Sequence, residues 1–147
     1  MTTWENDLTL GVRFMDHEHA GLHASLTELG ELAATELPVN TRALARDARA
    51  NAIRLRLDRL RLEVSTHFTH EEQVMRAHHY PRAGDHIAKH TKFLDELDAM
   101  SSTYAVGEAA MALRVVQFVQ IWFARHTVAS DQALGEWLNE HHPDVTT

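Results

Sequence analysis

Apolar residues recur along most of the chain at steps of three and four. Ile53, Leu57, Leu60 and Val64 show this spacing, which places their side chains on one face of a helix. Only six glycines and three prolines interrupt the pattern. We therefore predict an all-α chain that folds as an up-down-up-down four-helix bundle, because such a bundle needs helices of about 20 residues with short connections.

The limits of the predicted helices come from residues that end or begin a helix. One helix stops before Pro38 and another breaks at Tyr80-Pro81, because proline disfavours a helical conformation in the residue before it. Thr41 is the predicted N-cap of the second helix, and Gly107 separates the third from the fourth. The predicted helices cover residues 16–36, 41–79, 82–104 and 108–129, and residues 131–140 continue the last one or form a short extra turn.

Residues 1–15 precede the first predicted helix, and their apolar positions partly alternate: Trp4, Leu8, Leu10, Val12 and Phe14. Alternation is typical of extended chain, so we predict an extended N-terminal arm laid over the domain. The sequence shows no internal repeat and no linker long enough to divide domains. We expect residues 1–147 to form one domain, with the bundle at about 16–130 and a short helical extension at the C-terminus.

Each predicted helix places at least one histidine on its apolar face. The stripe of the second helix continues into His67 and Glu71, and the stripe of the third begins with His86 and His90. One hydrogen bond satisfies an isolated buried histidine, but inward histidines on four packed helices point to a shared site. In the first helix His19 leads into Leu22, Leu26, Leu29 and Ala33, and in the fourth Val115, Phe118 and Trp122 lead into His126.

The composition supports a metal site, because the chain has 12 histidines and no cysteine. Imidazoles and carboxylates buried without partners cost several kcal/mol for each ionised group, and a metal ion removes that cost. Residues four apart lie only about 40° apart around a helix. His67 with Glu71, and His86 with His90, can therefore reach one centre.

His126 and Asp131 need a different local geometry, because a five-residue step turns about 140° around an ideal helix. We predict a local widening or an end of regular helix near Val128, a feature common at functional sites. The donor set lacks thiolate, which suits iron, manganese or zinc better than copper(I). Five histidines and two carboxylates exceed what one ion takes, so the set implies two bridged ions with one coordination position open for a small diatomic molecule.

A family resemblance rests on several motifs taken together. They are Trp4 in the arm, Asp16-x-x-His19, His67-Phe68-x-x-Glu71-Glu72 followed by Met75, Tyr80-Pro81, His86-x-x-x-His90 with Phe93, and His126-x-x-x-x-Asp131. With these motifs in this order, the chain resembles the bacterial hemerythrins, a family of non-haem di-iron proteins that bind oxygen, over nearly its whole length. Glu18 and Ala20 depart from the glutamine and lysine that commonly flank the first histidine in that family, and Thr127 stands where isoleucine is frequent.

The resemblance implies a function as well as a metal centre. Dioxygen is expected to bind reversibly at the iron with two histidines, for oxygen storage, transport or sensing rather than catalysis. A di-iron enzyme acting on peroxide or nitric oxide is the alternative, because the open position accepts these ligands too. The implied ligands are His86, His90 and His126 on one iron and His19 and His67 on the other, with Glu71, Asp131 and an oxo or hydroxo group as bridges.

The other polar residues near these motifs are expected to have structural or surface roles. Glu72 is predicted to be a surface partner rather than a ligand, and Asp16 to cap the first helix. His17 and His23 lie near His19, and the alternative for either is a proton shuttle or a contact to a ligand. Seven histidines are assigned to solvent: His17, His23, His70, His78, His79, His141 and His142.

Apolar residues near the fourth-helix histidine are expected to surround the centre. These are Trp122, Phe123, Ile121 and Phe93. Most of them are ordinary core at helical spacing, but some must line the open position if the site exists. A dry wall there would slow the loss of peroxide and the oxidation of the resting irons.

Charge and hydropathy narrow the range of partners. Seven arginines lie between Arg42 and Arg61, and a basic stripe can bind nucleic acid. The whole chain is nevertheless acidic, with a formal charge of -7, so we expect a solvated helix face and no nucleic-acid partner. The longest apolar stretch, residues 115–124, is shorter than the roughly 20 residues of a membrane span, and the start lacks the pattern of a signal peptide. We expect a cytoplasmic protein with no membrane contact, and no motif identifies a protein partner.

Overall fold

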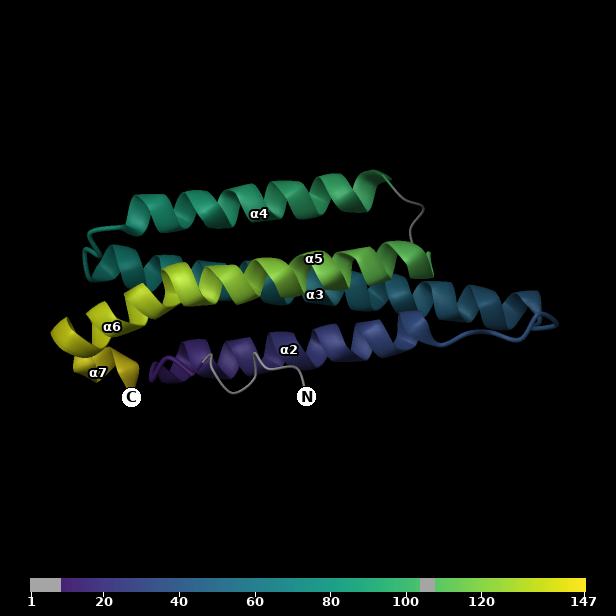
Figure 1. Cartoon of the computed structure of the whole chain (residues 1–147), viewed down its shortest axis with the longest axis horizontal. Coiled ribbons are helices and arrows are strands. Elements are labelled where there is room, and N and C mark those ends of the chain that lie inside the picture. Colours follow the sequence, from purple (N-terminus) through teal and green to yellow (C-terminus); the bar gives the residue numbers. More distant parts are fainter. Residues whose placement is uncertain (1–8, 104–107) are drawn as a thin grey trace.

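The computed structural model describes residues 9–103 and 108–147, and every regular element within these ranges is a helix. Four helices run antiparallel in sequence order along one long axis, as the colours of Figure 1 show. The predicted all-α, up-down-up-down bundle is therefore confirmed. The elements are α2 (Arg13–Ala34), α3 (Ala43–Ala77), α4 (Ala83–Thr103), α5 (Ala109–His126), the π-helix η1 (Thr127–Asp131), α6 (Gln132–His141) and α7 (Pro143–Thr146).

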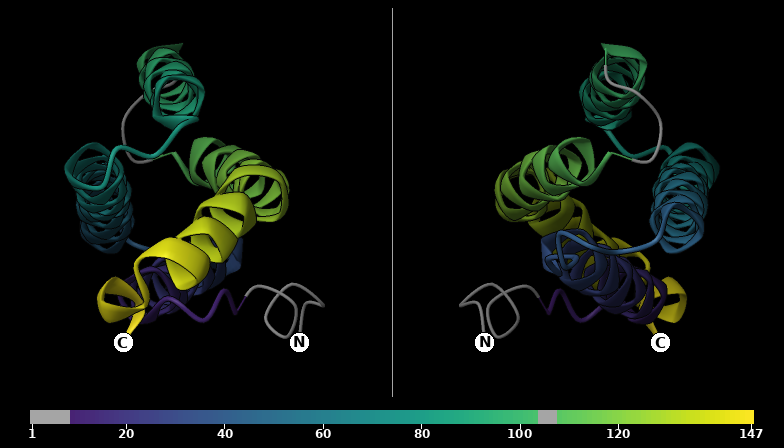
Figure 2. Two further views of the ribbon diagram at one scale, coloured as in Figure 1. Left: turned by 90° about the vertical axis from the view of Figure 1, so that its left-hand side faces the viewer. Right: turned by 90° about the vertical axis from the view of Figure 1, so that its right-hand side faces the viewer.

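The four long helices occupy the corners of a four-sided bundle when seen along its axis (Figure 2). Helix α2 packs against α3 and α5, and α4 packs against the same two helices from the opposite corner. Every long helix thus has one face turned to a shared interior. Side chains on four different segments can therefore meet at one point inside the bundle.

The first helix begins earlier than the alternating pattern indicates. Helix α2 starts at Arg13, and Met15 is fully buried on the same face as His19, so helical spacing already governs these positions. Val12 is the N-cap and makes no side-chain capping bond. The predicted extended segment is helical from residue 13 onward, and the predicted arm residues Trp4 and Leu8 lie outside the described residues.

Asp16 does not cap the first helix, contrary to the prediction. Its carboxylate instead accepts hydrogen bonds from the backbone N–H groups of Leu10 (2.8 Å) and Gly11 (3.1 Å), which precede the helix. Gly11 has a φ of 71°, a conformation that residues with a side chain rarely adopt. Asp16 therefore holds the chain that enters α2.

The second helix differs from the prediction at both ends. Arg42, not Thr41, is the N-cap of α3, and no side chain caps it; the Thr41 N–H instead closes a turn onto the carbonyl of Pro38 at 2.9 Å. At the other end α3 stops at Ala77, and His79 has a left-handed φ of 57° in the turn that follows. Helix α3 has 35 residues and extends beyond its neighbours at one end of the bundle (Figure 1).

Arginines at the start of α3 are held by the protein itself. Arg49 Nη2 donates to the carbonyls of Leu32 (3.2 Å) and Ala33 (2.8 Å), which lie in the last turn of α2, where carbonyls lack helical partners. Arg61 forms a bidentate salt bridge with the Asp98 carboxylate, with N–O distances of 2.7 and 2.9 Å. The arginine-rich face therefore joins α3 to α2 and α4.

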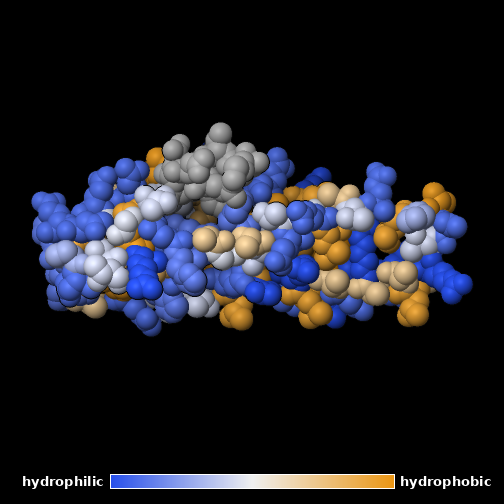
Figure 3. Space-filling view, turned by 90° about the horizontal axis from the view of Figure 1, so that it is seen from below, coloured by the Kyte–Doolittle hydropathy of each residue, from blue (hydrophilic) through white to orange (hydrophobic). Residues whose placement is uncertain are grey.

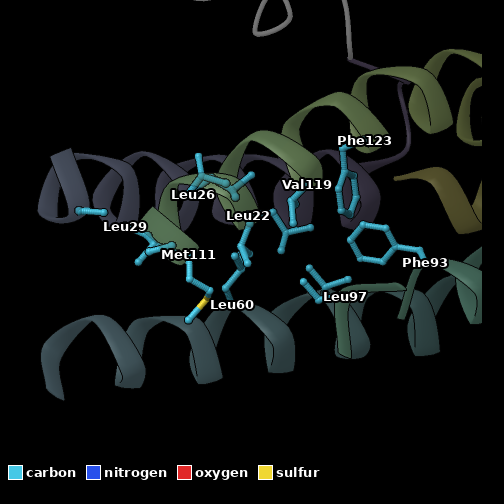
Figure 4. Close-up of a cluster of buried hydrophobic side chains, with 14 of the residues drawn as sticks. Leu22, Leu26, Leu29, Leu60, Phe93, Leu97, Met111, Val119 and Phe123 are labelled. Carbon is cyan, nitrogen blue, oxygen red and sulfur yellow. The ribbon is translucent and has the colours of Figure 1, made fainter. Parts of the chain in front are cut away.

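The main core fills the middle of the bundle, where side chains of the four helices point toward one another (Figure 4). Each fully buried Leu, Ile or Phe contributes roughly 1.5–3 kcal/mol to folding. On α5 the predicted stripe was partly wrong, because Phe118 and Trp122 are only partly buried. The most buried face of α5 is Met111, Ala112, Val115, Val119 and Phe123.

A second apolar cluster closes the end of the bundle where α6 and α7 lie (Figure 1). It joins the start of α2 to α6 and to the turn between α3 and α4. We call it the end cluster, and its buried members are Val12, Met15, Met75, Tyr80, Leu134 and Leu138.

The exterior is mainly hydrophilic, with apolar atoms in scattered patches on the face shown in Figure 3. Ile121, predicted to surround the site, is 47% exposed; that part of the prediction was wrong because its side chain lies on the outer face of α5. None of the helices in the described ranges combines the length and apolar character needed to cross a membrane.

Candidate metal centre

The structure brings together all seven residues that the sequence predicts as the site, and all seven are buried. Their nitrogen and oxygen atoms form two adjacent groups, within each of which the atoms lie within 4.8 Å of one another. One group contains three histidines and the other contains two. The three-histidine group is His86, His90 and His126, the two-histidine group is His19 and His67, and both groups share Glu71 and Asp131.

The imidazole nitrogens converge within each group. His19 Nε2 lies 3.1 Å from His67 Nε2, and His126 Nε2 lies 3.0 Å from His86 Nε2 and 3.1 Å from His90 Nε2. Two atoms bound at right angles at about 2.1 Å from one ion lie about 3 Å apart. These separations are therefore what two metal-bound imidazoles require.

The two carboxylates each offer one oxygen to each histidine group. Glu71 Oε1 lies 3.1 Å from His67 Nε2, and its Oε2 lies 3.2 Å from His90 Nε2. Asp131 Oδ2 lies 3.2 Å from His19 Nε2, and its Oδ1 lies 3.0 Å from the Nε2 atoms of His86 and His126. This is the arrangement of a bridging carboxylate.

The buried oxygens also lack ordinary hydrogen bonds. Both oxygens of Glu71 and both of Asp131 are buried and have no hydrogen-bond partner among the described residues, although imidazole nitrogens lie 3.0–3.4 Å away. Unpaired buried carboxylate oxygens are costly, and divalent metal ions would satisfy all four. The donor set and its orientation thus fit a pair of metal ions.

A π-helix places Asp131 in the site. Helix α5 ends at His126, and η1 follows from Thr127 to Asp131, with the Gln132 N–H bonded to the Thr127 carbonyl five residues earlier. The wider turn of a π-helix, with its hydrogen bonds between residues five apart, brings His126 and Asp131 onto one face. The predicted widening near Val128 is confirmed.

Burial and charge act in opposite directions on the histidines. Burial alone would lower the pKa of His67, but the charge of Glu71 and the contact with Glu18 raise it to about 10. Burial also opposes protonation of His86, yet contacts with Asp131 and Glu71 raise its pKa to about 9. Without metal, these two imidazoles would therefore be protonated at neutral pH.

The carboxylates remain ionised in the same surroundings. Burial and the nearby charge of Asp131 would raise the pKa of Glu71, but His67 lowers it below its usual range. Burial would also raise the pKa of Asp131, and its contacts with His126 and His19 hold it well below the usual value. Burial dominates at His126 itself, whose pKa is lowered. The centre without metal thus balances protons on imidazoles against two carboxylate charges.

Aromatic rings cover the three-histidine group. The ring of Phe68 stacks on His90 with a centroid separation of 3.8 Å and an interplanar angle of 4°, and Trp122 stacks on His126 at 4.2 Å and 18°. Phe123 lies beside the other group, with ring centroids 6.2 Å from His19 and 6.1 Å from His67. These rings fix the imidazoles and exclude water from their faces.

Two carboxylates outside the donor set were not predicted to support ligands. Glu72 accepts a hydrogen bond from His90 Nδ1 at 3.2 Å and pairs with Arg76. Glu18 accepts one from His67 Nδ1 at 2.9 Å. The only sequence signal was their position next to Glu71 and His19, and the rotation of one helix against another decides whether such a neighbour reaches a histidine.

All seven histidines assigned to solvent lie outside the two donor groups, but the assignment is only partly correct. Four of the seven are exposed and three are half-buried. His70 is exposed but not isolated, because its Nδ1 lies 2.6 Å from Glu18 Oε1. The exposed ones are His17, His70, His79 and His141, and the half-buried ones are His23, His78 and His142.

Comparison with known proteins gives one family. The family model described as the hemerythrin HHE cation-binding domain matches residues 10–141. A curated bacteriohemerythrin from Ralstonia nicotianae (strain ATCC BAA-1114 / GMI1000) is 28% identical over 89 residues, which cover 60% of this chain and 65% of that relative. The match therefore spans slightly less than two thirds of the relative's length. No solved structure matches the chain.

Proposed function

Because the chain belongs to the hemerythrin HHE cation-binding domain family, we propose that its buried centre holds two iron ions and binds dioxygen reversibly. Two redox-active irons with one open coordination position would supply a binding place for a small diatomic molecule and the electrons that its binding draws on. The observation that carries the proposal is the pair of carboxylates that each present one oxygen to either histidine group. Such binding would serve oxygen storage, transport or sensing.

The proposed ligand assignment follows the two groups. The three-histidine group would hold one iron and the two-histidine group the other, with Glu71 and Asp131 as bridges alongside an oxo or hydroxo group. The group with fewer imidazoles would leave the open position. Its neighbour Phe123 is 4% exposed and lies about equally far from both rings, which supports an apolar, water-poor place for a diatomic molecule.

The surrounding residues would limit side reactions by keeping the centre dry. Phe68 and Trp122 cover imidazole faces, and Phe68 is 2% exposed. Exclusion of water slows proton leakage and the loss of reactive species. This supports a binding role over turnover, while an enzyme acting on peroxide or nitric oxide remains the alternative function.

The test combines metal analysis with spectroscopy. Protein produced with sufficient iron should carry about two irons per chain, and the reduced protein should gain a visible charge-transfer band in air and lose it on degassing. Irreversible bleaching would favour the enzyme alternative, and a single zinc ion or no metal would contradict the proposal. His19→Gln should abolish the band, whereas His17→Gln, on the exposed face of the same helix, should leave it intact.

A further inference from the structure

We propose that Glu18 and His70 form an outer support for His67, which orients this imidazole and strengthens it as a metal ligand in the two-histidine group. Neither residue belongs to the donor set. The inference rests on the proposed metal centre but not on dioxygen binding. It concerns how two residues outside the donor set act on one of its histidines.

The contacts form a chain from solvent to the centre. The ring of His70 is exposed, and its Nδ1 lies 2.6 Å from Glu18 Oε1. The other oxygen, Glu18 Oε2, accepts from Nδ1 of His67 at 2.9 Å, and His67 Nε2 faces Glu71 and His19. Glu18 is 20% exposed at its side chain whereas His67 is 1% exposed, so the carboxylate stands at the boundary between solvent and interior.

A groove between α2 and α3 gives solvent access to this chain. Its volume is about 470 Å³, and Glu18 and His70 both line it. The α3 wall of the groove also includes Leu62, Glu63 and Thr66. The outer end of the support, at His70, is therefore exposed to solvent, while the inner end is the buried ring of His67.

Within the two-histidine group the contact of Glu18 with His67 has no counterpart at His19 among the described residues. His19 Nδ1 is buried and has no hydrogen-bond partner within residues 9–103 and 108–147, so the Glu18 contact is the outer hydrogen bond that orients an imidazole there. In the three-histidine group Glu72 accepts a hydrogen bond from His90, but the charge of Glu72 is also paired with Arg76. In the described part of the chain the ion pairs of Glu18 are with imidazoles alone, at His67 and His70.

General chemistry gives the consequence of this contact. A carboxylate that accepts from Nδ1–H fixes the tautomer, so that the Nε2 lone pair faces the metal, and it makes the imidazole a stronger donor. His70 binds the second oxygen of Glu18 and so fixes the carboxylate itself. Outer partners of this kind change metal affinity by about 10- to 100-fold when removed.

The experiment uses three variants of the full chain. Glu18→Ala removes the hydrogen bond and the charge, and Glu18→Gln keeps an acceptor but removes the charge. Glu63→Gln is the matched control, because Glu63 lines the same groove and bonds Ser25 and Arg59 rather than a histidine of the centre. Cobalt(II) titration of the metal-free proteins measures affinity without any dioxygen chemistry, and midpoint potentials are measured on the iron-loaded proteins.

We expect Glu18→Ala to weaken cobalt binding by about 10- to 100-fold. Glu18→Gln should bind cobalt within a few-fold of the unmodified chain but show a raised midpoint potential, and Glu63→Gln should change neither quantity. Equal cobalt affinities for Glu18→Ala and Glu63→Gln would overturn the inference. If Glu18→Ala does not fold, His70→Leu replaces it and should give a smaller loss of affinity, whereas no loss would overturn the inference. A chain that binds cobalt as expected but not dioxygen would contradict the proposed function alone.

Discussion

Asp131 Oδ1 lies 3.0 Å from His126 Nε2, although the two residues are five positions apart on one continuous helical segment. On a regular α-helix their side chains would diverge by about 140°. The π-helix η1 removes this divergence. The contact therefore shows that a local change of helical pitch brings the Asp131 carboxylate to the histidines of the centre.

Replacing Asp131 by Asn should lower the iron content from about two per chain to one or fewer. The amide keeps the size of the side chain but removes the charge and one of the two oxygens that face the histidine groups. Metal analysis of the purified protein measures this directly. Asp144→Asn, an exposed position in α7, is the control, and full iron retention in Asp131→Asn would argue against a bridging role.

Replacing Phe68 by Ala should destabilise the protein by about 3–5 kcal/mol, the range for emptying a buried aromatic site. Phe68 is 2% exposed and contacts Phe93 as well as His90. Water therefore cannot fill the cavity left by the ring without a cost in free energy. Urea unfolding of the metal-free protein gives the free energy. Phe118→Ala is the comparison, since its partly buried ring should cost clearly less, and equal losses would contradict the packing described for the core.

Two glycines should respond in opposite directions to replacement by Ala. Gly21 lies inside α2, and an added Cβ meets nothing within 4 Å, so Gly21→Ala should stabilise by about 0.5–1 kcal/mol. Gly11 has a φ of 71°, so Gly11→Ala should destabilise by about 1–2 kcal/mol. Thermal unfolding of both variants side by side checks the signs, and a gain of stability at Gly11 would be inconsistent with the positive φ.

The metal-free protein should lose stability as the pH rises from about 6.5 to about 10. The pKa values of His67 and His86 are raised from 6.5 to about 10 and about 9, so their stabilising protonation is complete below 6.5 and is lost as the pH passes through the raised values. The loss should exceed about 1.4 kcal/mol, the equivalent of one pKa unit.

At acid pH the carboxylates act in the opposite sense. The pKa values of Glu71 and Asp131 are lowered from 4.5 and 3.8, so their contribution is present above those values and disappears as the pH falls. His126, with its lowered pKa, also disfavours the folded state below 6.5. Denaturant unfolding from pH 4 to 10 should therefore give a maximum near pH 6 without metal, and a flatter profile once metal replaces the protons.

The sequence was sufficient for those site residues whose position depends on one helix alone. A four-residue step places two pairs on one helix face, His67 with Glu71 and His86 with His90. The five-residue step from His126 to Asp131 required an irregular turn, which the structure has at Thr127–Asp131. These are local properties, because the pitch of a helix fixes them before any packing occurs.

The predictions from the sequence were wrong where contacts between helices determine which side chains are buried or paired. Two stripes at helical spacing were available on α5, and only contacts with the other helices favour Val119 and Phe123 over Phe118 and Trp122. The role of Glu18 depends likewise on how α2 is rotated against α3. Thr41 has the chemistry of an N-cap, but the turn onto Pro38 uses its backbone and moves the start of the helix to the next residues.

The π-helix also affects residues at a distance from the candidate metal ligands. One residue fewer in η1 would rotate everything that follows by about 100°, and Leu134 and Leu138 would then turn away from Val12 and Met15, their present neighbours in the end cluster. The single irregular turn thus determines both the position of Asp131 in the candidate site and the packing of α6 and α7. A change in the length of η1 would therefore alter the candidate metal site and the packing of the C-terminal helices together.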